Sequence, residues 1–192
     1  MAIEYHKTEA LEARAISLEN HKKKTYNSET NKTMDADQKL REELLDYLDS
    51  ACTHKPLTEA AKDFPAEFIN RKVEGAPYSP WGLLEHIRIT QRDMVNFIEN
   101  HDYKEMDWPK DYWPKRTENA TRKMWENTLA EYLKDLEALR RIVKDPKNDL
   151  LSPIPRGSGQ TILKEVMQIV DHTSYHTGEL VLARRNIGAW KE

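Results

Sequence analysis

Residues 160–186 read QTILKEVMQIVDHTSYHTGELVLARRN, and this stretch predicts one long helix that ends just before Gly188. One face of the helix carries apolar residues at steps of three or four positions. This stripe consists of Ile162, Val166, Ile169, His172 or Thr173, His176 and Leu180. His172 and His176 therefore interrupt a buried face and do not lie on the solvent face.

The spacing of these two histidines suits metal binding. Side chains four residues apart on a helix have Cβ atoms ~5–6 Å apart, so both imidazoles can approach one ion at ~2.0–2.1 Å. The same spacing also occurs in helices whose histidines are solvated or hydrogen-bonded in the core, and that alternative stays open at this point. Thr173 follows His172, so the zinc-protease pattern HExxH, with its general base, is absent.

Helical periodicity recurs in the rest of the chain, and no run shows the alternation typical of strands. Further helices are predicted over 6–20, 35–52, 79–101 and from about 117 to 145, with a short turn near 58–63. Long joints, 102–117 and 145–159, separate the later helices. We expect an all-α protein: an antiparallel four-helix bundle over 34–192, with crossover connections as an option, and a polar N-terminal arm over 1–33.

Apolar residues mark the buried face of each predicted helix, and the start of the 79–101 helix is well defined. Ser79 is a good N-cap and Pro80 a good first-turn residue. The predicted stripes are Leu40, Leu44, Leu45, Tyr47 and Leu48; Leu83, Ile87, Thr90, Met94, Phe97 and Ile98; and Trp125, Leu129, Leu133, Leu136, Leu139 and Val143. The joint 102–117 is rich in Trp, Tyr and Pro, and its length suggests that it packs over a site.

A third metal ligand is available from the 79–101 helix. His86 lies one turn after Leu83 at the border of that helix's buried stripe. Facing helices of a bundle commonly supply ligands to one core site. Three imidazoles leave coordination positions open, which is the pattern of catalytic sites. The remaining histidines, His6, His21, His54 and His101, are expected to be solvated surface residues.

Composition limits the classes of function. The chain has 192 residues and a formal net charge of -3, so it has no general attraction for nucleic acid or acidic lipid. No apolar run approaches the ~20 residues of a membrane span, and the N-terminus lacks an apolar signal core. Cys52 is the single cysteine, and it is expected to be a small buried residue. Together these features predict a cytoplasmic protein.

Several stretches in the expected order resemble the DinB-like superfamily. SPWGLLEHIRITQRDMVNF (79–97) is similar to its second helix, with a W-x-x-x-E-H pattern, and DHTSYHTGELVLARRNIGAW (171–190) is similar to its last helix. DYWP (111–114) and IPRGSGQTILKE (154–165) resemble stretches of one subgroup. The resemblance covers roughly 35–192. It implies a four-helix bundle that holds a divalent metal on His86, His172 and His176, often as a homodimer.

The resemblance also implies an activity, because some relatives are transferases or isomerases that use a low-molecular-weight thiol. The hypothesis is that zinc or nickel, or alternatively manganese or iron, lowers the pKa of a bound thiol or water, which attacks a small electrophilic substrate. Hydrolysis through bound hydroxide is a further option. A non-catalytic, stress-related, metal-stabilised binding module is the alternative from a different class.

Several residues near the histidines allow two interpretations. Glu85 and Asp171 could orient the imidazoles, but each is adjacent to its histidine and points ~100° away, which favours surface ion pairs. Tyr175 is an active-site hydroxyl or an interface aromatic. Arg184 and Arg185 could bind an anionic substrate, although pairing with helix C-terminal carbonyls is favoured. The tryptophans Trp81, Trp108 and Trp113 are expected to be packing residues.

Overall fold

The computed structural model describes residues 36–49, 54–115, 118–190 of the chain. The chain divides into two units, Met1–Glu43 and Leu44–Glu192, and helices α2 to α5 belong to the second. The predicted arm over 1–33, with its helix and two histidines (His6 and His21), lies outside the described residues, as does Cys52. The predicted boundary between arm and bundle therefore stays a prediction.

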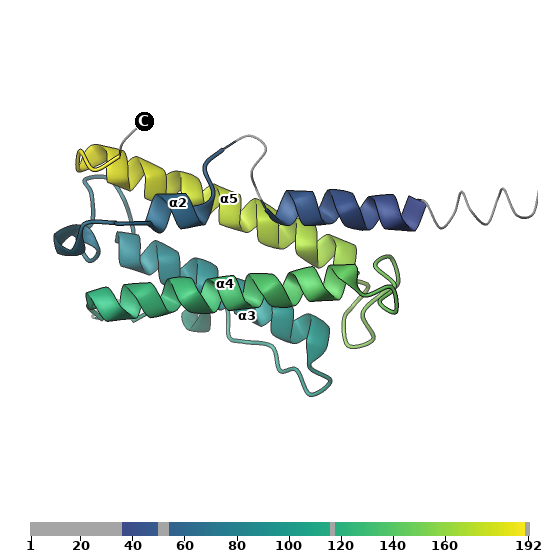
Figure 1. The fold of residues 1–192 in the computed structure, drawn as a ribbon. Coiled ribbons are helices and arrows are strands. Elements are labelled where there is room, and N and C mark those ends of the chain that lie inside the picture. The colour runs from purple at the N-terminus through teal and green to yellow at the C-terminus, as the bar shows by residue number, and fades with distance from the viewer. Residues whose placement is uncertain (1–35, 50–53, 116–117, 191–192) are drawn as a thin grey trace, which may run out of the picture. The chain divides into compact units, whose positions relative to one another are not determined.

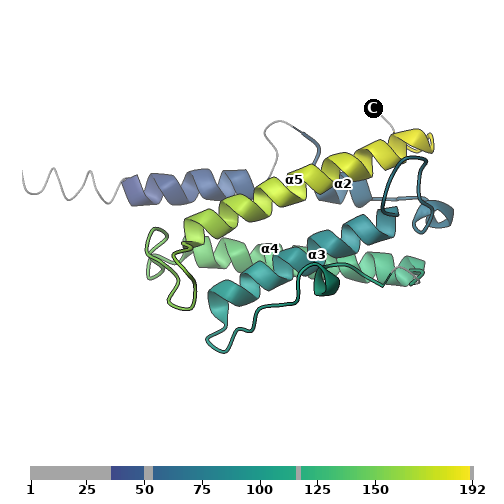
Figure 2. The ribbon, with the colours of Figure 1, turned by 180° about the vertical axis from the view of Figure 1, so that it is seen from behind.

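The part of the chain that the structure describes is all-α, with four main helices and a short one, and Figures 1 and 2 show their arrangement. A first helix covers residues 36–48. The others are α2 (Leu57–Ala61), α3 (Pro80–Glu99), α4 (Arg122–Lys144) and α5 (Ile162–Asn186), with single 3-10 turns η1 (Ala66–Phe68) and η2 (Lys110–Tyr112). Among the described residues, extended pairing is confined to one isolated bridge between Pro153 and Thr161. The predicted helices are thus confirmed within the described ranges.

Side-chain caps define where the long helices begin. The Ser79 hydroxyl accepts the backbone N–H of Gly82, with Pro80 in the first turn, as predicted for α3. Thr161 caps α5 in the same way. The predicted start of α4 near residue 117 is wrong, because Thr121 accepts the N–H of Met124 and the helix begins one residue later.

Helix α3 packs against both α4 and α5, and α2 packs against α5. Helices α3 and α5 run in opposite directions (Figure 1). Helices α3 and α4 run in the same direction, because successive contacts pair Glu85 with Thr128, and Arg92 with Asp135. The expected antiparallel order is therefore wrong for α3 and α4. Two parallel helices need a crossover connection, which was the alternative considered.

The joint between α3 and α4 is long enough for this crossover. An extended chain covers ~3.3–3.6 Å per residue, whereas α3, with 20 residues, is ~30 Å long. The joint of residues 100–121 can therefore return along the whole helix before α4 begins. This path carries η2 alongside α3, and the two elements are in contact.

The core is formed by the apolar faces of α3, α4 and α5 together with residues from α2 and the joints. Its most deeply buried large side chains are Trp125, Phe64, Ile69, Leu84, Ile87, Leu139, Leu150, Leu180, Val95 and Val143. The predicted stripes were wrong at Tyr47 and Leu133, which are 44% and 39% exposed. Trp108 is 68% exposed and is therefore not a packing residue, whereas Trp81 is buried as expected.

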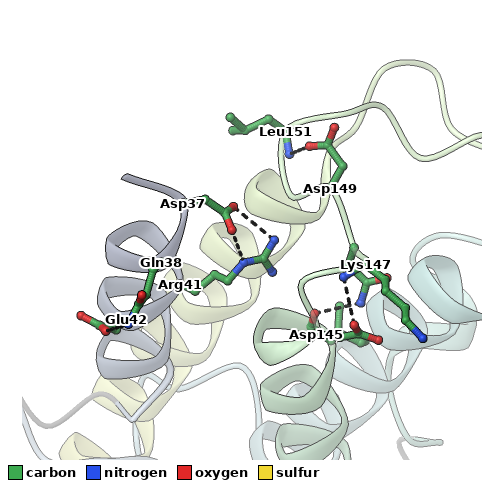
Figure 3. Close-up of polar contacts among 10 residues, drawn as sticks. Asp37, Gln38, Arg41, Glu42, Asp145, Lys147, Asp149 and Leu151 are labelled. Carbon is green, nitrogen blue, oxygen red and sulfur yellow. Dashed lines mark hydrogen bonds and ion pairs between the residues drawn. The ribbon is translucent and has the colours of Figure 1, made fainter. Parts of the chain in front are cut away.

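The joint between α4 and α5 is organised by short aspartate turns (Figure 3). The Asp145 carboxylate accepts the backbone N–H of Lys147, and the Asp149 carboxylate accepts that of Leu151. Such side-chain turns satisfy backbone donors that no helix pairs. In the first helix, Arg41 donates to Asp37 one turn away, at 2.8 Å.

Within the described residues, no helix combines the length and apolar character needed to cross a lipid bilayer.

The core assignment of α4 predicts a clear contrast between two leucines of the same helix. Leu139 is 0% exposed, so Leu139→Ala should lower the free energy of unfolding by ~2–5 kcal/mol. Leu133→Ala, at an exposed position, should change it by less than ~0.5 kcal/mol. Urea denaturation of both variants measures the difference. Equal losses would contradict the assigned orientation of α4.

Candidate metal centre

Three histidines from two antiparallel helices meet in the interior of the protein. His86 comes from α3, and His172 and His176 come from successive turns of α5. One ligand nitrogen of each lies within 4.8 Å of the other two. Within the residues that the structure describes, no other group of three or more His, Cys, Asp or Glu side chains gathers in this way.

The His86 ring is fixed by its own partners. Its Nδ1 lies 2.7 Å from the backbone carbonyl oxygen of Tyr112, which can only accept, so Nδ1 carries the proton. The Nε2 lone pair is therefore directed away from Tyr112 and lies 3.0 Å from Nε2 of His172. The side chain is 1% exposed, which leaves little solvent to compete for this nitrogen.

The His176 ring is held in an equivalent manner by an acid. Its Nδ1 lies 2.6 Å from Oε2 of Glu179, one turn later on α5. A carboxylate accepts this proton and leaves Nε2 as the ligand atom. A second partner that fixes the tautomer and raises ligand basicity is typical of metal-binding histidines.

The donor set fits a divalent transition-metal ion. Two imidazoles present unprotonated Nε2 atoms toward a common point, and His172 places its own Nε2 beside one of them. Neutral imidazole suits zinc, nickel, copper and iron. Three protein ligands leave positions open for another molecule, as in catalytic sites. The site predicted at His86, His172 and His176 is therefore a possible three-histidine metal site.

The surroundings of His172 and His86 favour the neutral form of these two rings. Burial lowers the pKa of His172 to about 3, and the neighbouring imidazoles of His176 and His86 act in the same direction. Burial also lowers the pKa of His86, although its hydrogen bond to the Tyr112 carbonyl opposes the shift. Neutral imidazole is the form that binds metal, so these shifts favour ligation in mildly acidic solution.

An aromatic stack covers one side of the cluster. The Trp113 ring lies parallel to the His86 ring, with centroids 3.7 Å apart and planes 4° apart. Tyr78 stacks on the other face of Trp113 at 3.7 Å. Trp113 thus helps to fix the plane of His86. The expectation that the joint 102–117 packs over a site is met by Tyr112 and Trp113.

The neighbouring acids do not take the orienting role considered for them. Glu85 accepts from Arg88 at 2.6 Å and from Thr128 at 2.9 Å, which confirms the ion-pair alternative. Asp171 is exposed, and none of the described hydrogen bonds joins it to a histidine. Instead, Tyr112 and Glu179 orient the rings. Glu179 was detectable from its three-residue spacing to His176, whereas a backbone carbonyl from a distant joint leaves no sequence signal.

The other residues considered near the site lie elsewhere or at its edge. Arg184 donates to the carbonyl oxygen of Ala189 beyond the end of α5, as favoured, but also to those of Ala60 and Lys62 at the end of α2, which was not expected. Arg185 is exposed and stands over the Trp190 ring. Tyr175 is 67% exposed, and its ring centroid is 4.9 Å from that of His176.

Two histidines expected at the surface are indeed exposed. His54 contacts the Lys55 carbonyl and Ser174, and His101 contacts Arg156. Neither ring belongs to the three-histidine cluster.

Comparison of the chain with family models, curated proteins and solved structures finds no match.

The low pKa of His172 predicts a pH-dependent stability of the metal-free protein. The pKa of His172 falls from its ordinary value of 6.5 to about 3 in the folded protein. Between these pH values, the ring binds a proton in the unfolded chain but not in the folded protein. The free energy of unfolding is therefore highest above the unfolded pKa and decreases as the pH falls through this range. The slope of the unfolding free energy against pH measures how many more protons the unfolded chain binds than the folded protein. In chelator-treated protein, His172→Gln should lower this number by about one. The chelator-treated wild type gives the reference slope, and an equal slope in His172→Gln would contradict the prediction.

The different surroundings of two acids on α5 predict different effects on metal affinity. Glu179→Ala removes the acceptor of the His176 ring proton and should weaken metal binding ~10–100-fold. Asp171→Ala, which removes an exposed acid of the same helix, should leave the affinity unchanged. Competition with a chromogenic chelator measures both. An equal loss in the two variants would assign the effect to net charge rather than to ring orientation.

Proposed function

We propose that the protein is a DinB-like, metal-dependent enzyme that acts on a small electrophilic molecule with a thiol or water as nucleophile. The observation that carries this proposal is the convergence of three imidazoles, two of them with their Nδ1 protons held by fixed acceptors. A bound divalent ion would supply Lewis acidity, lowering the pKa of a thiol or water so that the nucleophile exists near neutral pH.

The residues of the chain have defined tasks in this proposal. Tyr112 and Glu179 hold the imidazole protons and so keep the ligand nitrogens available. Trp113 excludes water from one face of His86 by stacking on it. Fixed ligands need little reorganisation when a substrate arrives, which favours catalysis.

Two cavities beside the cluster support a small-molecule substrate. One of about 250 Å³ is lined by Tyr78, Leu83, Glu179 and Leu182, among others, and thus adjoins the partner of His176. Another, of about 380 Å³, is lined by Tyr78 and Trp113 together with three lysines, Lys72, Lys110 and Lys115. Lysines favour an anionic ligand, and many low-molecular-weight thiols carry carboxylates. The two cavities, one of them with lysines in its wall, therefore support a thiol co-substrate and a small electrophile.

A homodimer is part of the proposal. Met167, Tyr175 and Leu182 are 51%, 67% and 58% exposed, and their spacing of eight and seven residues places them along one face of α5. A row of large exposed apolar side chains is typical of an interaction surface. The proposed interpretation of Tyr175 is accordingly that of an interface aromatic.

The first test of the proposal is metal content. Wild-type protein purified without chelator should hold about one divalent ion per chain, and added zinc or nickel should raise the melting temperature of the chelator-treated protein. His172→Ala should lose both properties, because two nitrogens bind far less tightly than three. His54→Ala changes a histidine outside the cluster and should behave as wild type. A wild type without metal or metal-dependent stabilisation would refute the site.

The second test separates an enzyme from a non-catalytic metal-stabilised module. Metal-loaded protein should accelerate the reaction of glutathione or bacillithiol with an electrophile such as an alkyl or aryl halide, or hydrolyse an activated ester. His172→Ala should lower this rate at least ~100-fold, to near the uncatalysed background. Metal binding without metal-dependent turnover across such a panel would favour the binding module.

A further inference from the structure

A second group of ionisable side chains lies on the same helix pair, away from the histidines. Asp93 is seven residues after His86 on α3, and Glu165 is seven residues before His172 on α5. Seven residues are about two turns, so each acid is on the same face of its helix as the histidine. Because the helices are antiparallel, both acids lie toward the same end of the pair. They line a cavity of about 680 Å³.

Asp93 is buried, and only part of its carboxylate is satisfied. The residue is 8% exposed. Its Oδ2 accepts hydrogen bonds from the hydroxyls of Tyr112, at 2.6 Å, and Tyr103, at 3.3 Å. Its Oδ1 is buried and has no hydrogen-bond partner among the described residues. A buried carboxylate oxygen without a donor is costly and calls for an explanation such as a missing ligand.

Glu165 adds a second buried carboxylate to the same cavity. It is 6% exposed, and the described contacts include no hydrogen bond to its side chain. Burial raises the pKa of Glu165, and the charge of Asp93 raises it further, against the opposing charge of Lys164. Burial, followed by the charge of Asp93, likewise raises the pKa of Tyr103 to about 12. A cation beside the two buried carboxyl groups would stabilise both in the charged form.

The basic residues of the cavity wall do not neutralise these acids directly. Arg156 donates to the carbonyl oxygens of Phe97 and Ile98 at the end of α3 and contacts His101. Lys164 is exposed, and no described ion pair joins it to Asp93 or Glu165. The two buried acids thus keep the capacity to accept hydrogen bonds from a cation in the cavity.

We propose that this cavity binds a small organic cation, whose ammonium group donates hydrogen bonds to Asp93 and Glu165. Charge-assisted hydrogen bonds to a buried carboxylate are among the strongest that proteins make. A volume of 680 Å³ is in the range of small-molecule sites, ~300–1,000 Å³, and far exceeds the space of one ion. Met94 and Phe97 contribute apolar wall for the carbon skeleton of the ligand.

The proposed site does not depend on the metal. None of the three histidines lines the cavity, so a metal-free protein keeps its carboxylates and its volume. Failure of the amine site would leave the metal proposal untouched, and the reverse also holds.

Calorimetric titration of the full chain with phenethylammonium tests the inference. Its uncharged counterpart, 2-phenylethanol, has the same skeleton and lacks the charge. We expect millimolar, saturable binding of the ammonium compound, at least ~10-fold tighter than that of the alcohol. Asp93→Asn and Glu165→Gln should each weaken the ammonium at least ~10-fold and leave the alcohol unaffected. Equal binding of the two compounds, or no saturable binding to the wild type, would overturn the proposal.

Two controls make the result specific to the cavity. Glu99→Gln removes an exposed acid of α3 that does not line the cavity, and it should bind as the wild type does. In chelator-treated protein, His172→Ala should also keep wild-type binding, whereas its loss would place the amine on the histidine cluster and refute the assignment. Asp93→Asn also changes a tyrosine contact, so melting curves check that each variant is folded. If Glu165→Gln folds and binds as tightly as the wild type, the proposal fails.

Discussion

The antiparallel packing of α3 against α5 is the constraint on which both candidate sites depend. It brings His86 opposite His172 and His176, and it brings Asp93 and Glu165 to the same cavity two turns away. Side chains repeat on one helix face at about seven residues. A slip of one turn between the helices would separate both sets at once. The packing therefore has to be specified by the apolar residues between them, such as Ile87 and Ile169, which are 0% and 3% exposed.

Burying three imidazoles beside one another is unfavourable unless their nitrogens are satisfied. Polar groups removed from water need partners, and the protein supplies them on the outer side of the cluster through Tyr112 and Glu179. The inner nitrogens lie close together, and Nε2 of His172 is 3.0 Å from Nε2 of His86. A divalent ion bound there would accept their lone pairs together. The cluster therefore fits a possible ligand set.

Helical periodicity placed His172 and His176 on a buried face and His86 at the border of one, and it predicted most helix bounds. The stripe on residues 160–186 placed two histidines inward, and Ser79 with Pro80 marked the start of α3 correctly. The crossover between α3 and α4 was left open, because periodicity identifies a buried face but not the direction of its neighbour. Exposed Leu133 and Trp108 show the same limit: residue type favours burial, whereas the path of the surrounding joints decides it.

The residues that hydrogen-bond to the three histidines were harder to predict than the histidines themselves. Glu179 has the i, i+3 spacing that allows contact with His176, whereas none of the described hydrogen bonds joins the adjacent acids, Glu85 and Asp171, to a histidine. Tyr112 acts through a backbone oxygen, and such a contact depends on the path of a joint whose conformation no periodic pattern encodes. The resemblance to DinB-like proteins supplied the ligand set and gave no information on these contacts.

Tyr112 contacts both sites with its two ends, its carbonyl at His86 and its hydroxyl at Asp93. Such a residue provides a route for thermodynamic coupling. If a ligand of the cavity shifts Tyr112, the basicity and orientation of the His86 ring shift with it, and the metal affinity changes by some factor. Linkage requires that the metal change the affinity for the cavity ligand by the same factor. The single 3-10 turn η2 would then couple two sites that share no ligand.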